Sequence, residues 1–376
     1  MKKISIILLI FNIFITTSCM AQTTITVKKV PSETPESAKI YVTGNFNKWN
    51  IADENYLLTE NSGIYSITLN SKLDTIQFKF SQGTWESIET DEKGFEIKNR
   101  ILKTSKTEEV EFEIMGWKNS TEVASTCAEN VYILEDSFYM PQLDRYRRIW
   151  IYLPPDYENP ENSEKHYPVI YMHDGQNLFD AATSFSGEWN VDETLNSLYD
   201  STGFSIIVVG IDNGSQERIN ELTPWHNEEY GGGEGQKYSE FIVHTLKPFI
   251  DLNYRTLSDR ENTGIMGSSL GGLISFYMGL KYNDVFAKIG AFSPSFWINT
   301  EIYDFAREFK PEYKFDLYIL AGGKESANLY SEVSEMEKIL NKKRKTNVNV
   351  KKVANGKHNE EFWSKQFKNA ILKLWE

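Results

Sequence analysis

The chain has 376 residues, of which 40% are hydrophobic and 25% are charged, and this composition is typical of a folded protein with one to three domains. The formal net charge is −13, from 40 lysines and arginines against 53 aspartates and glutamates. This acidic balance argues against nucleic acid as the partner, because binding a phosphate backbone needs a basic face. The two cysteines and five histidines form no metal-ligand cluster, so we expect neither a metal nor an organic cofactor.

The first 21 residues have the organisation of a secretory signal, with two lysines, an apolar stretch at 4–15 and then small residues. Two processing sites compete. Cleavage can follow Ala21, or it can precede Cys19, which would then carry a lipid. We therefore expect an exported protein that is periplasmic, anchored to the outer membrane or extracellular. Contact with a membrane is expected only through a lipid on Cys19, and the oligomeric state stays open.

Residues 22–118 consist of short segments in which apolar and polar residues alternate, and no long helical period occurs in them. This spacing predicts a small all-β, immunoglobulin-like sandwich. Residues 119–130 are small and polar, which predicts a linker. The expected strands lie at 24–27, 39–43, 64–69, 76–80 and 109–114.

Residues 131–376 have a different pattern, in which continuous apolar runs alternate with segments of helical period. The runs at 149–153, 169–172 and 206–210 are typical of strands buried on both faces. This alternation predicts an α/β domain with a mostly parallel sheet covered by helices. The expected helices include 190–199, 236–250, 270–281 and 327–342.

The pattern Gly267-x-Ser269-x-Gly271 follows a predicted strand and precedes a predicted helix. A serine at such a sharp turn has strained backbone geometry, and small neighbours allow the turn to close. We therefore predict that Ser269 is a catalytic nucleophile, the alternative being a tight structural turn. The helix that follows would direct its N-terminus at a developing oxyanion, with the Leu270 N–H as one donor.

A serine nucleophile needs a base and an acid that orients the base. In hydrolases of this kind the order along the chain is serine, acid and histidine, and His358 is the one histidine that follows Ser269. Glu325 comes directly after the strand predicted at 315–320, where catalytic groups of open α/β sheets collect. We therefore predict a triad of Ser269, His358 and Glu325, and the alternative for Glu325 is a solvated loop carboxylate.

The second oxyanion donor is expected in the loop after an earlier strand. The segment His173-Asp174-Gly175-Gln176 has this place, and we predict the Gln176 backbone N–H as the donor, with His173 and Asp174 bracing the loop. Further side chains either line an aryl or sugar cleft or belong to the core. These possible substrate-binding residues are His173, Trp189, Trp225 and Trp297.

Five separate segments carry a family resemblance, and they lie at 147–157, 167–180, 267–272, 292–297 and 356–360. In this order they resemble the "Putative esterase" family of α/β hydrolases, over residues 131–376. That family includes feruloyl esterases, acetyl xylan esterases and enterobactin esterases. The resemblance implies an α/β-hydrolase fold and ester hydrolysis by Ser269, Glu325 and His358. The family uses either aspartate or glutamate as the acid.

The front region carries a second resemblance. The segment 40–49, which ends in Gly44-Asn45-Phe46-Asn47-Lys48-Trp49, is similar to the G-x-F-N-x-W strand of starch- and glycogen-binding modules. The resemblance implies that Trp49 and Trp85 stack on sugar rings, since a flat aromatic face suits a pyranose. The alternative is that both tryptophans are structural.

Taken together, these patterns predict an exported serine esterase that acts through an acyl-enzyme on an ester substrate, and the expected substrate is an acyl or feruloyl ester on a polysaccharide. Two alternatives stay open. One is a hydrolase of catecholate siderophore esters, and the other is a glycan-binding protein whose hydrolase domain is an inactive scaffold.

Overall fold

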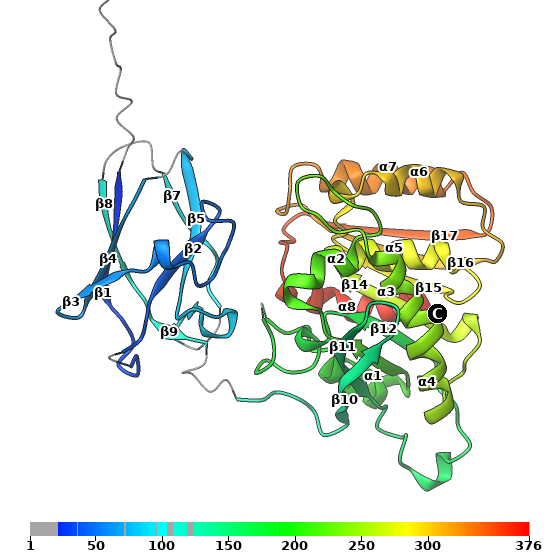
Figure 1. The fold of residues 1–376 in the computed structure, drawn as a ribbon. Helices are drawn as coiled ribbons and strands as arrows, with labels where there is room; N and C mark the ends of the chain where they lie inside the picture. The colour runs from blue at the N-terminus through cyan, green and yellow to red at the C-terminus, as the bar shows by residue number, and fades with distance from the viewer. Residues whose placement is uncertain are drawn as a thin grey trace, which may run out of the picture. The chain divides into compact units, whose positions relative to one another are not determined.

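The computed structural model divides the chain into two compact units, with the boundary between residues 123 and 124 (Figure 1). The predicted signal segment, residues 1–21, and residues 119–123 of the predicted linker lie outside the part that the structure describes. Within the described part, no helix is long and apolar enough to cross a bilayer. The described residues are 22–35, 37–70, 73–92, 94, 96–103, 108–118, 124–185 and 187–375.

The front unit is the expected β-sandwich. Its strands form a four-stranded sheet in the order β3-β4-β1-β8, a three-stranded sheet in the order β2-β5-β7 and the pair β6-β9. Alternate residues of these strands point inward, so that Val27, Phe78 and Phe80 are completely buried. The strands are β1 (Thr23–Lys29), β2 (Tyr41–Gly44), β3 (Thr59–Asn61), β4 (Ile64–Leu69), β5 (Thr75–Ser81), β6 (Glu89–Thr90), β7 (Arg100–Lys103), β8 (Glu108–Glu113) and β9 (Gly116–Trp117), with short 3₁₀ helices at Glu54–Tyr56 and Trp85–Ser87.

The second unit contains one eight-stranded sheet in the order β10-β11-β13-β12-β14-β15-β16-β17. β10 and β11 pair antiparallel at one edge, and every pair from β13 to β17 is parallel. The mostly parallel sheet predicted from the apolar runs is therefore confirmed. The strands are β10 (Val131–Met140), β11 (Arg145–Tyr152), β12 (Val169–His173), β13 (Ile207–Ile211), β14 (Thr263–Ser268), β15 (Lys288–Phe292), β16 (Phe315–Gly322) and β17 (Thr346–Val353).

Helices cover both faces of this sheet (Figure 1). α1 and α8 pack on one face, where Ile170 and Met172 of β12 point. α3, α5, α6 and α7 pack on the other face, where Tyr171 points. The helices are α1 (Val191–Thr202), α2 (Arg218–Leu222), α3 (Gly235–Phe241), α4 (Lys247–Asn253), α5 (Leu270–Lys281), α6 (Glu301–Glu308), α7 (Leu329–Leu340) and α8 (Glu360–Trp375), with 3₁₀ turns at Pro160–Asn162, Gly175–Asn177, Ser215–Glu217, Arg260–Asn262 and Phe296–Ile298.

Two details differ from the sequence-based expectation. The helix expected over 236–250 is interrupted by a π-helical turn at Ile242–Leu246, so that α3 and α4 are separate elements. Part of the predicted linker is bound to the second unit, because the Ala128 N–H donates to Asp192 at 2.8 Å and the Asn130 amide donates to the Leu153 carbonyl at 2.7 Å. Local polar composition does not reveal such contacts, since their partners lie far along the sequence.

Candidate active site

Ser269 lies between β14 and α5 with φ 57° and ψ −119°, which is a sparsely populated backbone conformation for a residue with a side chain. Hydrogen bonds hold this turn from both sides. The Ser269 N–H donates to the Phe292 carbonyl at 2.9 Å, and its own carbonyl accepts from the Ser295 N–H at 3.0 Å. At Gly267, a Cβ atom would lie 2.8 Å from the Gly271 carbonyl group, so a side chain there would prevent the turn from closing.

The two predicted oxyanion donors lie after neighbouring parallel strands. Leu270 is the first residue of α5, and its N–H has no partner within the helix. Gln176 lies in the 3₁₀ turn after β12, which pairs with β14. The Leu178 N–H donates to the Gly175 carbonyl at 3.1 Å and so holds the peptide group that carries the Gln176 N–H. Gly175 itself packs on β13, where a Cβ atom would lie 2.9 Å from the Asp212 nitrogen.

The structure brings His358 and Glu325 together from the loops after β17 and β16. Nδ1 of His358 lies 2.7 Å from Oε2 of Glu325, whose side chain is only 2% exposed. The other oxygen, Oε1, accepts from the Gly322 N–H and from the Ser293 hydroxyl, both at 2.7 Å. This carboxylate is therefore buried and hydrogen-bonded at both oxygens, so it can hold an imidazole ring in one orientation.

Two serines, Ser293 and Ser295, and Trp363 complete this arrangement, although no pattern in the sequence predicted a role for them. The Ser293 hydroxyl also accepts from the indole N–H of Trp363 at 2.9 Å, and the Trp363 ring stands edge-on to His358. The Ser269 hydroxyl lies 3.1 Å from the Ser295 hydroxyl, and no hydrogen bond joins Ser269 to His358 among the described residues. The signal that points to both serines is the segment 292–297, in which they flank a proline.

His173 and Trp189 are corrections to the list of possible substrate contacts, because both are buried. His173 is 2% exposed and lies behind the serine turn, where a Cβ atom at Gly267 would be 2.9 Å from its ring. Trp189 is 3% exposed and packs on Phe292 and Trp363. Both side chains therefore support the site from inside the core.

The other predicted aromatic side chains are more accessible. Trp297 is 51% exposed, and its ring stands edge-on to Tyr230. Trp225 is half-buried, and its backbone N–H and carbonyl are both hydrogen-bonded to Asn299. In the front unit Trp49 and Trp85 are half-buried, a degree of exposure that suits both a sugar platform and a structural role.

Asp174 anchors the turn Gly175–Asn177, named the oxyanion turn below for its predicted donor Gln176, through an ion pair whose carboxylate is buried. It has a left-handed backbone with φ 58°, and its carboxylate accepts from Nε and Nη2 of Arg218 at 2.7 and 2.9 Å. The Asn213 amide donates to the same carboxylate at 2.7 Å. Burial favours a higher pKa for Asp174, but the Arg218 charge and these hydrogen bonds outweigh it and hold the pKa below its ordinary value. Asp174 therefore stays ionised and keeps the turn in place.

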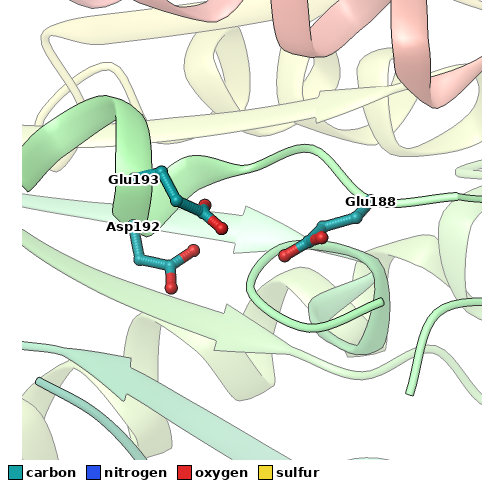
Figure 2. Close-up of side chains that lie close together, drawn as sticks. All are labelled: Glu188, Asp192 and Glu193. Carbon is teal, nitrogen blue, oxygen red and sulfur yellow. The ribbon is translucent and has the colours of Figure 1, made fainter. Parts of the chain in front are cut away.

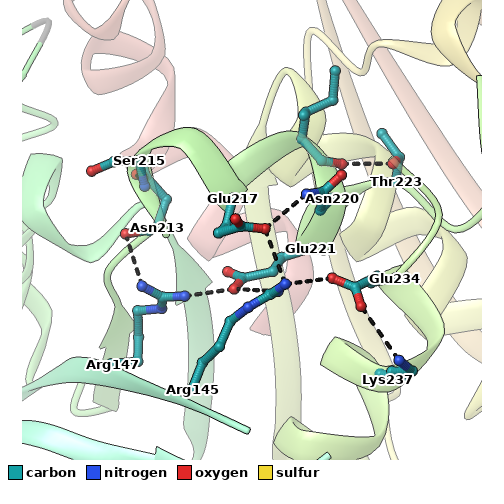
Figure 3. Close-up of polar contacts among 11 residues, drawn as sticks. Arg145, Arg147, Asn213, Ser215, Glu217, Asn220, Glu221, Thr223, Glu234 and Lys237 are labelled. Atoms are coloured by element: carbon teal, nitrogen blue, oxygen red, sulfur yellow. Dashed lines mark hydrogen bonds and ion pairs between the residues drawn. The ribbon is translucent and has the colours of Figure 1, made fainter. Parts of the chain in front are cut away.

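The helix that carries Arg218 is fastened to β11 by a second charged network (Figure 3). Glu221 of α2 is 1% exposed and accepts from Arg145 at 3.1 Å and from Arg147 at 2.6 Å. Arg145 also pairs with Glu234 at 2.7 Å. These contacts fix α2 against β11 and so hold Arg218 in place beside Asp174.

Burial of His173 predicts a specific acid sensitivity. Burial lowers the pKa of His173 to about 4, whereas an unfolded histidine titrates near 6.5. Between these two values the unfolded chain binds a proton that the folded chain does not, so stability falls as the pH is lowered. We expect this residue alone to cost about 3 kcal/mol of unfolding free energy by pH 4.

The measurement is urea unfolding of the wild type and of His173→Gln from pH 7 down to pH 4.5. The expected result is that the difference in unfolding free energy between the two proteins shrinks or reverses as the pH falls. A difference that stays constant over this range would contradict the buried, neutral state of His173.

The chain is similar in sequence to known proteins over part of its length. It is 32% identical to the uncharacterized protein YbbA of Bacillus subtilis (strain 168) over 158 residues, which are 40% of this chain and 58% of YbbA. It is 43% identical to an alpha-amylase of Niallia circulans over 93 residues, which are 24% of this chain and 7% of the amylase. The matches therefore span less than two thirds of either relative.

Among solved structures, the enterobactin esterase FES from Shigella flexneri is similar in fold, with a TM-score of 0.53 at 16% identity. That match covers 90% of this chain and 88% of FES, so it extends into the front unit. A family model described as "Putative esterase" matches residues 141–374, which is more than half of the chain. With the serine turn, the parallel sheet and this match in agreement, the chain belongs to this esterase family of α/β hydrolases.

Proposed function

We propose that this protein is an exported serine esterase that hydrolyses carboxylic esters through an acyl-enzyme on Ser269. The observation that carries the proposal is the buried Glu325 carboxylate bound to Nδ1 of His358, at the same edge of the sheet as the strained turn at Ser269. Family membership supports ester hydrolysis as the reaction.

The reaction begins when Oγ of Ser269 attacks the ester carbonyl carbon and Nε2 of His358 takes the hydroxyl proton. Glu325 keeps Nδ1 protonated and stabilises the imidazolium. The Leu270 and Gln176 N–H groups stabilise the oxyanion, which collapses as His358 donates the proton to the leaving alcohol. Water then attacks the acyl-enzyme with His358 as the base, and the acid is released with Ser269 restored.

The contact between Ser269 and Ser295 defines a resting state of the nucleophile. The Ser269 hydroxyl must turn from Ser295 toward His358 before it can lose its proton. Catalytic hydrogen bonds of unliganded enzymes are commonly long and tighten when substrate binds. Substrate binding therefore has to bring the serine and the histidine into contact.

Ser293 is expected to act through Glu325, because its hydroxyl donates to the oxygen that does not face His358. A hydrogen bond to a charged group contributes about 1.5–3 kcal/mol. We therefore expect Ser293→Ala to lower kcat by about tenfold with little change in KM. Ser331→Ala, on the exposed face of α7, is the matched control and should leave kcat unchanged. Equal kcat values for wild type and Ser293→Ala would contradict this role.

The substrate proposed for this activity is an acyl or feruloyl ester on a polysaccharide outside the cytoplasm. The half-buried Trp49 and Trp85, the similarity to an alpha-amylase and the signal-like residues 1–21 support it. Trp297 also supports an aryl substrate, because it is exposed and lies two residues after Ser295, which contacts the nucleophile.

The substrate class is tested by comparing kcat/KM for methyl ferulate, p-nitrophenyl acetate and a feruloylated xylan oligomer. The proposal predicts the highest kcat/KM for the feruloylated oligomer. When Trp49 and Trp85 are both replaced by alanine, kcat/KM should fall for the oligomer and stay unchanged for the two small esters. Equal values for all three esters, unaffected by these replacements, would contradict a polysaccharide-linked substrate.

A siderophore ester is the second candidate, and one observation favours it. The fold match to the enterobactin esterase extends over both units of the chain rather than over the hydrolase unit alone. Turnover of a catecholate trilactone with a kcat/KM above that of the feruloylated oligomer would establish this candidate in place of the first.

A further inference from the structure

Three carboxylates that the proposed ester chemistry does not use lie together at the start of α1 (Figure 2). Glu188 comes from the loop before the helix, and Asp192 and Glu193 come from its first turn. One oxygen from each residue lies within 4.8 Å of the other two. Two oxygens that each lie about 2.4 Å from one Ca²⁺ ion are at most about 4.8 Å apart, so each pair of these oxygens meets the distance condition for sharing one ion.

Two of these carboxylates have a buried oxygen without a hydrogen-bond partner among the described residues. Asp192 is 0% exposed; its Oδ2 accepts from the Ala128 N–H at 2.8 Å, whereas its Oδ1 has no partner. Oε2 of Glu188 accepts from the Thr126 hydroxyl at 2.9 Å, whereas its buried Oε1 has none. A buried carboxylate oxygen left without a donor is destabilising, so this site favours an additional positive group.

Neighbouring carboxylates add negative charge to this site. The negative charge of Glu193 repels the carboxylates of both Glu188 and Asp192, and the charge of Asp180 also repels that of Glu188. Asp180 is hydrogen-bonded to the segment around Ser125, whose hydroxyl donates to its carboxylate at 2.9 Å. Figure 2 shows the side chains of Glu188 and Glu193 directed toward one another, with Asp192 beside them.

We propose that Glu188, Asp192 and Glu193 bind one Ca²⁺ ion. Carboxylate oxygens are the ligands that hard divalent cations prefer. Ca²⁺ accepts the irregular arrangement that a loop and a helix turn provide, whereas Mg²⁺ requires near-ideal octahedral geometry. Water molecules complete the coordination sphere on the exposed side of Glu193.

The ion would join the loop before α1 to the first turn of the helix, and a third stretch of chain is already bound there. The segment around Thr126 and Ala128 is hydrogen-bonded to Glu188 and Asp192. The loop before α1 is in turn fastened to the oxyanion turn, since the Trp189 N–H donates to the Asn177 carbonyl at 2.9 Å. Bound Ca²⁺ therefore stabilises this corner of the unit. None of the three ligands belongs to the proposed triad, so this inference does not depend on the ester chemistry.

The test is thermal unfolding and titration calorimetry of the EDTA-treated protein with CaCl₂ at about 10 mM, compared with NaCl at equal ionic strength. We expect Ca²⁺ to raise Tm by roughly 5 °C in a saturable way and NaCl to leave it almost unchanged. Glu193→Gln should weaken Ca²⁺ binding by at least about tenfold, because it removes one charged ligand from an exposed position where folding is not at risk.

Asp200→Asn is the matched control, since Asp200 is an exposed carboxylate on the same helix. It should bind Ca²⁺ as the wild type does. The proposal is overturned if the wild type shows neither binding heat nor a Tm shift beyond that of NaCl. It is also overturned if the wild type, Glu193→Gln and Asp200→Asn respond equally to Ca²⁺.

Discussion

We expect replacement of Ser269 with alanine to lower kcat for ester hydrolysis by about 10⁴- to 10⁶-fold and to leave the fold intact. The loss is large because the acyl-enzyme cannot form without Oγ of Ser269, and only binding and the oxyanion donors remain to act on the ester. The free energy of unfolding should change by less than about 1 kcal/mol, since among the described residues the hydroxyl is hydrogen-bonded to Ser295 alone. Steady-state kinetics on p-nitrophenyl acetate together with urea unfolding measure both quantities.

Ser268→Ala is the control for this variant, because Ser268 is the neighbouring residue and is 6% exposed at the end of β14. Its hydroxyl takes no part in the proposed reaction, so activity should stay within about threefold of the wild type. If Ser269→Ala retained more than a hundredth of the wild-type kcat, or if Ser268→Ala lost as much as Ser269→Ala, the assignment of the nucleophile would be wrong.

Arg218→Met is expected to destabilise the protein by about 3–5 kcal/mol, because it removes the cation that pairs with the buried Asp174 carboxylate and leaves that charge uncompensated. Asp174 is 7% exposed and would lose both hydrogen bonds from the guanidinium group. Since Asp174 holds the turn that carries the Gln176 N–H, kcat should also fall, by up to about 10²-fold. Urea unfolding and kinetics at a temperature where the variant is folded give the two values.

Arg307→Met is the matched control, because Arg307 is 49% exposed and pairs with Asp304 and Glu335 on the surface. It should cost at most about 1 kcal/mol. Adding Asp174→Asn to Arg218→Met should recover part of the lost stability, because the uncompensated charge is then gone. Equal costs for Arg218→Met and Arg307→Met would contradict the anchoring role of the buried pair.

The parts of the site that sequence reasoning found are those with a local pattern or a fixed order. Ser269 stands out because its turn needs small neighbours between a buried strand and a helix, and all of these are contiguous in the chain. His358 and Glu325 were reached through the order of elements in the fold. The structure places these two side chains in contact, 33 positions apart.

The residues that sequence reasoning missed are held by long-range packing. Arg218 contacts Asp174 across 44 positions, and no periodicity marks either residue. For His173 and Trp189 the sequence left substrate contact and a core role open, and the fold buries both side chains. Glu188, Asp192 and Glu193 are close together in the sequence, but only the folded structure shows that two of these carboxylates have a buried oxygen without a hydrogen-bond partner among the described residues.

The most direct test of the proposed mechanism is covalent labelling with a p-nitrophenyl alkylphosphonate. Oγ of Ser269 should displace p-nitrophenolate from phosphorus, giving one adduct per chain and loss of all esterase activity. Peptide fragmentation must separate Ser268 from Ser269, and the proposed mechanism predicts the adduct on Ser269 in the wild type and no adduct in Ser269→Ala. An adduct on another residue, or full esterase activity in a protein that takes up no label, would contradict it.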